Sequence, residues 1–167
     1  SRAAWRNEML AHQPQDAASW NDLGLAHEEE GRREAARAAF TRATELDPNY
    51  SRGWTNQGRL ALEDDDEERA LACFTRAVAA GPRNAVAHAN LGMLQLRRGE
   101  VHASEATYRR ATEIAPGMVP AWRGLARALH ARGAQEEAES ALDEALRLAP
   151  RDRLALELRA RWAAGED

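Results

Sequence analysis

Five of the six prolines in this chain of 167 residues recur at a spacing of 34 residues. They are Pro14, Pro48, Pro82, Pro116 and Pro150. Self-similarity at a fixed period of this length indicates stacked structural units, each of which contacts mainly its neighbours along the chain. The period therefore constrains the architecture before any single element is assigned.

Other residue types follow the same period. They are Trp20, Trp54, His88 and Trp122; Phe40, Phe74, Tyr108 and Leu142; and Ala43, Ala77, Ala111 and Ala145. With Leu-Gly pairs after the tryptophan, this pattern resembles the tetratricopeptide repeat (TPR) family. The resemblance implies an all-α fold, a right-handed superhelical solenoid of antiparallel helix pairs.

The composition agrees with a helical chain, because Gly and Pro are few and Ala, Arg, Leu and Glu are abundant. Gly31, Gly99 and Gly133 are expected to end the first helix of their repeats, since glycine tolerates a left-handed backbone. The predicted first helices are 17–30, 51–63, 85–98 and 119–131, and the second helices are 34–46, 67–80, 101–114 and 135–148.

We expect a single TPR domain over residues 1–167, with four full repeats between two half-repeats. The expected segments are an N-terminal half-repeat helix (2–16), repeats at 17–50, 51–84, 85–118 and 119–152, and a capping helix (153–167). In the capping helix, Leu154, Leu156, Leu158 and Trp162 are expected to cover the open end of the stack. The chain begins inside a unit, which suggests a fragment of a longer protein or a helix that a second copy covers.

The resemblance implies a concave groove that is lined by the first helix of each pair and receives a peptide. On the second repeat, Trp54, Gly58 and Ala61 have the spacing of a packing face, so Arg52 and Asn56 fall on the other face. The same register gives the candidate groove residues Asn21, Arg52, Asn56, Arg59, Asn90, Met93, Arg97, Arg123, Arg127 and His130.

Two features of this candidate groove suggest how a partner would bind. Asn56 and Asn90 occupy equivalent positions, and their amides could pair with an extended peptide backbone. Asparagine is equally common on a helix face that only contacts solvent, so that alternative stays open. Acidic residues precede a series of arginines along the groove, which favours a partner with an acidic segment. Some TPR proteins bind the C-termini of chaperones through a carboxylate clamp of Asn, Lys and Arg side chains. This sequence does not match the clamp, because residues without positive charge stand at the positions of its last two cations.

Candidates for chemistry are weak. The acidic run 64–68 lacks the spacing of a calcium loop and is better explained as a turn and helix start. The five histidines lack the spacing of a zinc site, and His27 and His88 occupy aromatic slots of the repeat. Cys73 has no basic partner nearby in the sequence. We expect no cofactor, no metal and no enzymatic activity.

The expected partner is a protein or peptide. A formal net charge of -4 disfavours nucleic acid, and no apolar run is long enough to enter a membrane. A cytoplasmic location is expected, although an upstream targeting segment could be missing. The predicted function is a non-catalytic protein-binding module; the alternatives are a self-assembling scaffold that stacks through its terminal helices, with a possible homo-oligomer, and the targeting domain of a larger enzyme.

Overall fold

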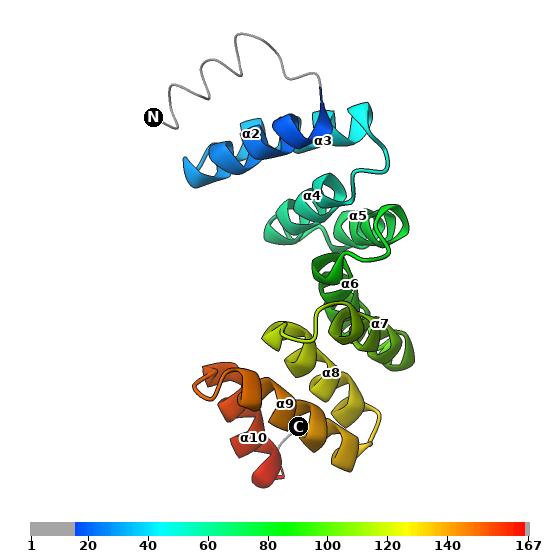
Figure 1. Cartoon of the computed structure of the whole chain (residues 1–167), viewed down its shortest axis with the longest axis vertical. Helices are drawn as coiled ribbons and strands as arrows, with labels where there is room; N and C mark the ends of the chain where they lie inside the picture. The colour runs from blue at the N-terminus through cyan, green and yellow to red at the C-terminus, as the bar shows by residue number, and fades with distance from the viewer. Residues whose placement is uncertain (1–15, 166–167) are drawn as a thin grey trace. The chain divides into compact units, whose positions relative to one another are not determined.

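The structure, a computed structural model, describes residues 16–165, which form helices and turns and contain no strand. Figure 1 shows the helices in chain order. Their bounds are α2 Ala17–Glu29, α3 Arg33–Leu46, α4 Ser51–Glu63, α5 Glu67–Ala80, α6 Ala85–Arg97, α7 Val101–Ile114, α8 Val119–Ala131, α9 Gln135–Leu148 and α10 Arg153–Ala163. Each of the first eight begins and ends within one residue of its predicted range, and the all-α fold is confirmed.

The turn inside each repeat has the backbone that the sequence predicted. Gly31, Gly99 and Gly133 have φ angles of 70°, 75° and 85°, in the left-handed region that glycine enters without steric cost. The second repeat has Asp65 at the equivalent position, with φ 58°. The following Asp66 accepts a hydrogen bond from the Arg69 N–H at 3.1 Å and so caps α5, as the helix-start interpretation of the acidic run predicted.

The two helices of a repeat approach closely where a glycine of the first meets an aromatic ring of the second. Phe40 and Phe74 are fully buried. A Cβ on Gly24 would overlap the Phe40 ring, and one on Gly58 would lie 2.6 Å from Phe74 Cε1. Between repeats, a Cβ on Gly124 of α8 would overlap the Tyr108 ring of α7. These glycines are required because any side chain would overlap the ring that fills the space between the helices.

Trp54 and Trp122 connect successive repeats through hydrogen bonds. The Trp54 indole is half-buried, and its Nε1 donates a hydrogen bond to the Pro48 carbonyl at 2.9 Å. Trp122 Nε1 donates to the Pro116 carbonyl in the same way, at 2.7 Å. The tryptophan thus joins its own repeat to the proline that ends the preceding one.

The capping helix α10 covers the core with fewer residues than predicted. Ala155 is fully buried, and Leu158 and Trp162 pack partly against the core formed by α8 and α9. Leu154 and Leu156 are instead 52% and 45% exposed, so the expectation that they cover the stack is wrong. The buried face of α10 follows Ala155, Leu158 and Trp162, at spacings of three and four residues, and Leu156, two residues before Leu158, points nearly the opposite way.

The chain divides into two compact units, residues 1–87 and 88–167. In the first, α2 packs on α3, α3 on α4, and α4 on α5; in the second, α7 packs on α8, α8 on α9, and α9 on α10. The two helices α6 and α7 are joined by the Ser104 hydroxyl, which donates to the Gly92 carbonyl at 2.7 Å. The predicted N-terminal half-repeat helix lies outside the described residues.

Candidate protein-interaction surface

Two of the candidate groove residues of the first unit bind each other. Asn56 Nδ2 of α4 donates to Asn21 Oδ1 of α2 at 2.7 Å, and Asn21 is buried. This bond links the first helices of two successive repeats. One donor and one acceptor of this amide pair are therefore already engaged within the protein.

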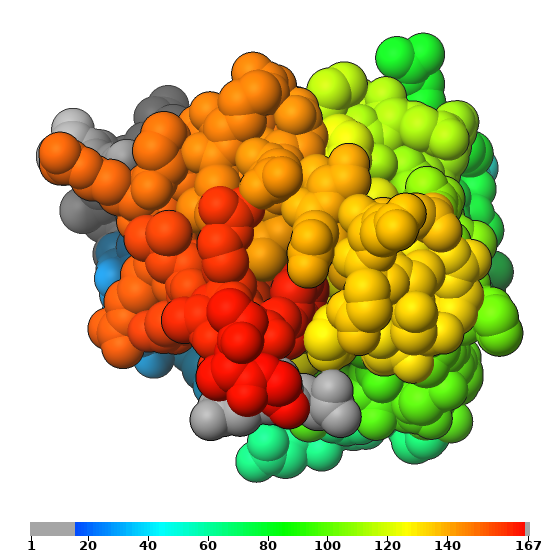
Figure 2. Space-filling model, turned by 90° about the horizontal axis from the view of Figure 1, so that it is seen from below, coloured from blue at the N-terminus to red at the C-terminus, as the bar shows by residue number. Residues whose placement is uncertain are grey.

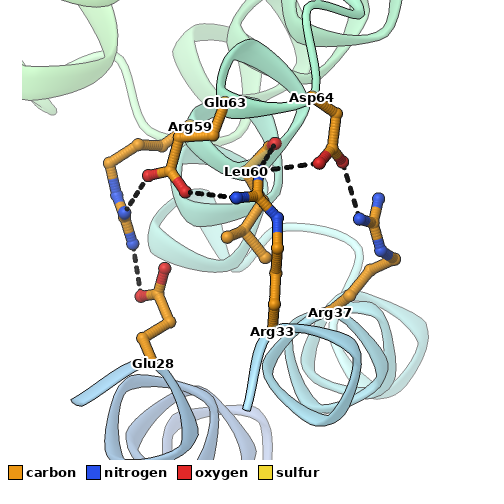
Figure 3. A network of polar contacts seen from close by, with 7 residues as sticks. All are labelled: Glu28, Arg33, Arg37, Arg59, Leu60, Glu63 and Asp64. Carbon is orange, nitrogen blue, oxygen red and sulfur yellow. Dashed lines mark hydrogen bonds and ion pairs between the residues drawn. The ribbon is translucent and has the colours of Figure 1, made fainter. Parts of the chain in front are cut away.

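Arg59 of α4 is also engaged within the first unit. Its guanidinium contacts the Glu28 carboxylate of α2 and lies 3.0 Å from a carboxylate oxygen of Glu63, one turn further along α4. Glu28 is well covered, with 17% of its side chain exposed. Figure 3 shows Arg59 held between these two carboxylates.

The same network continues onto α3 (Figure 3). Arg33 contacts Glu63 at 3.2 Å and Asp64 at 2.7 Å, and its Nη2 donates to the Leu60 carbonyl at 3.1 Å. Arg37 contacts Asp64 at 2.6 Å, and this hydrogen bond, with Arg33 beside it, lowers the pKa of the Asp64 carboxyl. Glu28, Glu63 and Asp64 are thus neutralised by arginines of the same unit.

Arg52 is the candidate of this unit that stays exposed, on the first turn of α4. In the second unit, the first-helix residues of α6 differ in exposure. Asn90 is half-buried, Met93 packs partly against the core of the unit, and Arg97 is exposed near the end of α6.

Arg123 of α8 binds Asp152, which caps α10. Arg123 Nη1 lies 2.9 and 3.0 Å from the two Asp152 oxygens, and the Ala155 N–H donates to Asp152 at 2.8 Å. Partial burial disfavours the ionised carboxyl, but the Ala155 N–H and the Arg123 guanidinium outweigh it and lower the pKa of Asp152. The sequence placed Arg123 in the groove, whereas the structure gives it a structural partner.

Arg127 and His130 border an open hollow of about 770 Å³ in the second unit. Figure 2 shows this end of the chain, with α10 in red beside the C-terminal end of α8 in yellow. The described residues that line the hollow are Leu96, Arg127, His130, Ala131, Arg132, Gly133, Gln135, Leu158, Arg161 and Trp162. A smaller hollow of about 260 Å³ shares the wall of Arg127, Leu158 and Arg161.

Side chains around the larger hollow are held in place by contacts. The His130 ring stacks on Trp162 with 4.3 Å between centroids and 6° between planes. His130 Nδ1 lies 2.8 Å from Gln135 Oε1. Arg132 contacts Glu105 at 3.0 Å and Glu137 at 2.7 Å. These contacts order the rim before any partner binds, which lowers the entropic cost of binding.

Part of this surface was not predicted from the sequence. Leu96, Arg132 and Trp162 line the hollow but were not among the candidate groove residues. The repeat carried a signal for two of them, because positions 68 residues apart are equivalent and Leu96 and Arg132 replace Glu28 and Asp64.

The described residues show few features of a metal site or of a reactive thiol. Residues 16–165 hold no group of three or more His, Cys, Asp and Glu side chains that could bind a metal ion. Burial raises the pKa of the Cys73 thiol, which keeps it protonated at neutral pH. Among the helices described, none is long and apolar enough to cross a membrane.

Comparison with protein families agrees with the repeat pattern. Models described as tetratricopeptide repeat match residues 17–50, 55–119 and 98–161, and together they span the helix pairs described above. The chain is a tetratricopeptide repeat protein. The predicted family is therefore confirmed.

Solved structures support the fold of this TPR protein. One described as the crystal structure of MamA protein is 22% identical, with a TM-score of 0.69, and covers 86% of this chain and 78% of the other. Another, described as the crystal structure of MamA, is 22% identical with a TM-score of 0.71 and covers 86% and 84%. The comparison with curated proteins found no match. TPR proteins bind other proteins and are generally non-catalytic, so the chain is a protein-interaction or scaffold module.

Proposed function

We propose that this TPR protein is a non-catalytic module that binds a peptide or helix of a partner protein on the first helices of its repeats. The concave groove that the family resemblance implies is the binding surface. The observation that carries the proposal is the hollow of about 770 Å³ beside α8, which combines apolar side chains with arginines. Binding sites for peptides commonly combine a concave apolar surface with a few polar groups that fix orientation.

Within the candidate groove, the residues differ in what they can offer a partner. Asn21, Asn56, Arg59 and Arg123 already bind other residues of the protein, so we assign them to the support of the surface. The residues that we propose for partner contacts are chosen by position: Arg52 and Arg97 are exposed, Arg127 and His130 border the hollow, and Asn90 and Met93 lie on α6.

The test is selection of binding peptides from a displayed random library on the purified chain, followed by affinity measurement with a double variant, Asn90→Ala and Arg127→Glu. We expect the double variant to lose binding while its circular dichroism and unfolding midpoint stay unchanged. Selected peptides that bind the folded variant as well as the original would contradict this placement.

A second candidate function, self-assembly through the terminal helices, is favoured by the exposure of Leu154 and Leu156 on α10. Light scattering over a wide concentration range tests it. A mass that rises with concentration, and that falls to the monomer in Leu156→Glu or after deletion of residues 1–15, would favour assembly. A constant monomer mass would contradict it.

The cytoplasmic location stays a prediction, which fractionation of the native cells would test.

A further inference from the structure

Two boundaries between successive repeats can be compared residue by residue, because positions 68 residues apart are equivalent in a chain that repeats every 34. The boundary between the first and second repeats has Glu28, Arg59, Glu63 and Asp64. Their counterparts at the boundary between the third and fourth repeats are Leu96, Arg127, Ala131 and Arg132. The arginine of α4 is kept in α8, and all three carboxylates are replaced.

The first of these boundaries is neutralised by its own residues. Arg59 lies between the carboxylates of Glu28 and Glu63, and Asp64 is bound by two arginines of α3. The hollow at this place measures only about 200 Å³, and Glu28 and Glu63 form part of its lining. A partner carboxylate would find the position beside Arg59 already occupied.

The second boundary has an ion pair at the position of Arg37 and Asp64 and no carboxylate at the positions of Glu28 and Glu63. The pair of Arg37 with Asp64 is replaced by Glu105 with Arg132, which has the opposite polarity and an N–O distance of 3.0 Å. Arg132 is therefore compensated. Arg127 is exposed and, among residues 16–165, has no carboxylate within ion-pair distance.

All four counterparts line the hollow of about 770 Å³, and the described part of its lining contains no Asp or Glu. Leu96, Leu158 and Trp162 supply an apolar surface beside Arg127. The adjoining hollow, on the other side of the same wall, adds Leu154 and also Glu157, whose carboxylate pairs with Arg153 at 2.6 Å. The larger hollow thus presents a guanidinium next to an apolar surface.

We infer that this hollow binds the Asp or Glu side chain of a partner segment, with a large apolar side chain of the same segment against Leu96, Leu158 and Trp162. The partner carboxylate takes the role beside Arg127 that Glu28 and Glu63 have beside Arg59. A guanidinium binds a carboxylate through two parallel, charge-assisted hydrogen bonds, which makes Arg127 the residue that determines specificity. This inference rests on the proposed function and adds the repeat that binds and the chemical class of the partner.

The test uses peptides selected from the displayed random library, synthesised with blocked ends and a fluorescent label. We expect them to contain Asp or Glu beside an aliphatic or aromatic residue. Replacing the acid by its amide should weaken binding to the original chain about ten-fold or more, since the pair is charge-assisted. This comparison needs no protein variant, so it remains decisive even where a variant fails to fold.

Protein variants locate the contact. Arg127→Glu should remove the preference for the acidic peptide over its amide counterpart. Leu96→Glu should do the same by placing a carboxylate where Glu28 stands in the first repeat, whereas Leu96→Gln, of the same size and without charge, should keep the preference. Arg151→Glu makes the same charge change as Arg127→Glu at an exposed arginine outside the hollow, and should also keep it.

Other results would overturn either the inference or the proposed function. Selected peptides that bind through the groove but lack acids, or an acid preference that survives Arg127→Glu, would overturn the inference and leave the proposed function standing. Inorganic phosphate that displaces the acidic peptide at low concentration would overturn it too, because the site would then be a general anion site. If no peptides are selected at all, the proposed function itself fails.

Discussion

The boundary between the first and second repeats and the boundary between the third and fourth both have an arginine at the equivalent place, Arg59 and Arg127, and differ in the charge around it. Both also have a glycine on the later first helix that packs on an aromatic ring, but Gly58 meets Phe74 of its own repeat and Gly124 meets Tyr108 of the preceding repeat. Around Arg59 the protein supplies the carboxylates, whereas around Arg127 it supplies leucine and alanine. One fold thus yields a closed, self-neutralised boundary and an open, basic one, because packing positions and surface positions of the repeat vary independently.

Changes at these two glycines have the largest expected effect. Gly58→Ala and Gly124→Ala should each lower the free energy of unfolding of its own unit by about 2–3 kcal/mol, since the added Cβ overlaps Phe74 or Tyr108. Denaturant unfolding together with hydrogen exchange resolved by helix would measure it.

Gly31→Ala is the matched control, because its Cβ would contact nothing within 4 Å and only the φ of 70° is unfavourable. Its cost should be about 1 kcal/mol. Equal losses for Gly31→Ala and Gly124→Ala would contradict the importance of the aromatic contact.

The helix caps of the two units give the next largest effect. Asp152→Ala removes both the cap of α10 and the partner of Arg123, and should cost about 1–2 kcal/mol. Asp66→Ala removes only a cap, that of α5, and should cost about 1 kcal/mol or less. Exchange rates of the α10 and α5 amides would measure both. A larger loss for Asp66→Ala would show that the Arg123 pair adds nothing.

Converting the first boundary into a copy of the second tests whether the residues around the arginine decide what it binds. The combined change Glu28→Leu, Arg37→Glu, Glu63→Ala and Asp64→Arg should create a second preference for acidic peptides around Arg59. It should also lower the free energy of unfolding by about 1 kcal/mol or less, since these ion pairs are partly exposed and screened. A titration with the labelled acidic peptide would detect a second site per chain. Its absence, in a variant that remains folded, would mean that the apolar surface of α10 is also required.

The smallest effect concerns pH. The pKa of Asp64 in the folded protein lies below its ordinary value of 3.8 because Arg37 and Arg33 bind the ionised carboxyl. The stabilisation from this pair is therefore complete above about pH 4 and is lost as the pH falls through the lower, folded pKa. Unfolding midpoints between neutral and acid pH should fall less steeply in Asp64→Asn than in the original chain. Parallel curves would show that Asp64 contributes no pH dependence.

Much of the fold could be predicted from the sequence because the same residue types recur at each packing position of the repeat. The helix bounds, the left-handed turns at Gly31, Gly99 and Gly133, and the burial of Phe40 and Phe74 all follow from the period. The exposure of Leu154 and Leu156 could not be predicted in this way, since the capping helix has no second repeat packed against it and its register must be set by contacts.

The candidate surface was predicted less completely. Arg127 and His130 were placed on the groove side and do border the hollow. The partners of Asn56, Arg59 and Arg123 lie 35, 31 and 29 residues away in the sequence. Whether such side chains meet depends on their rotamers and on the distance between neighbouring helices, which no local pattern encodes.

The sequence by itself determined the family, the limits of helices α2 to α9, and the glycines and aromatics that pack in the first three repeats. Those features depend on backbone conformation and on residue size, which recur with the repeat. Only the tertiary structure decided which polar side chains are engaged and which are available. The free energy of an ion pair depends on the distance and solvent exposure of two particular groups, so Arg59 and Arg127, alike in the repeat, differ in what they can bind.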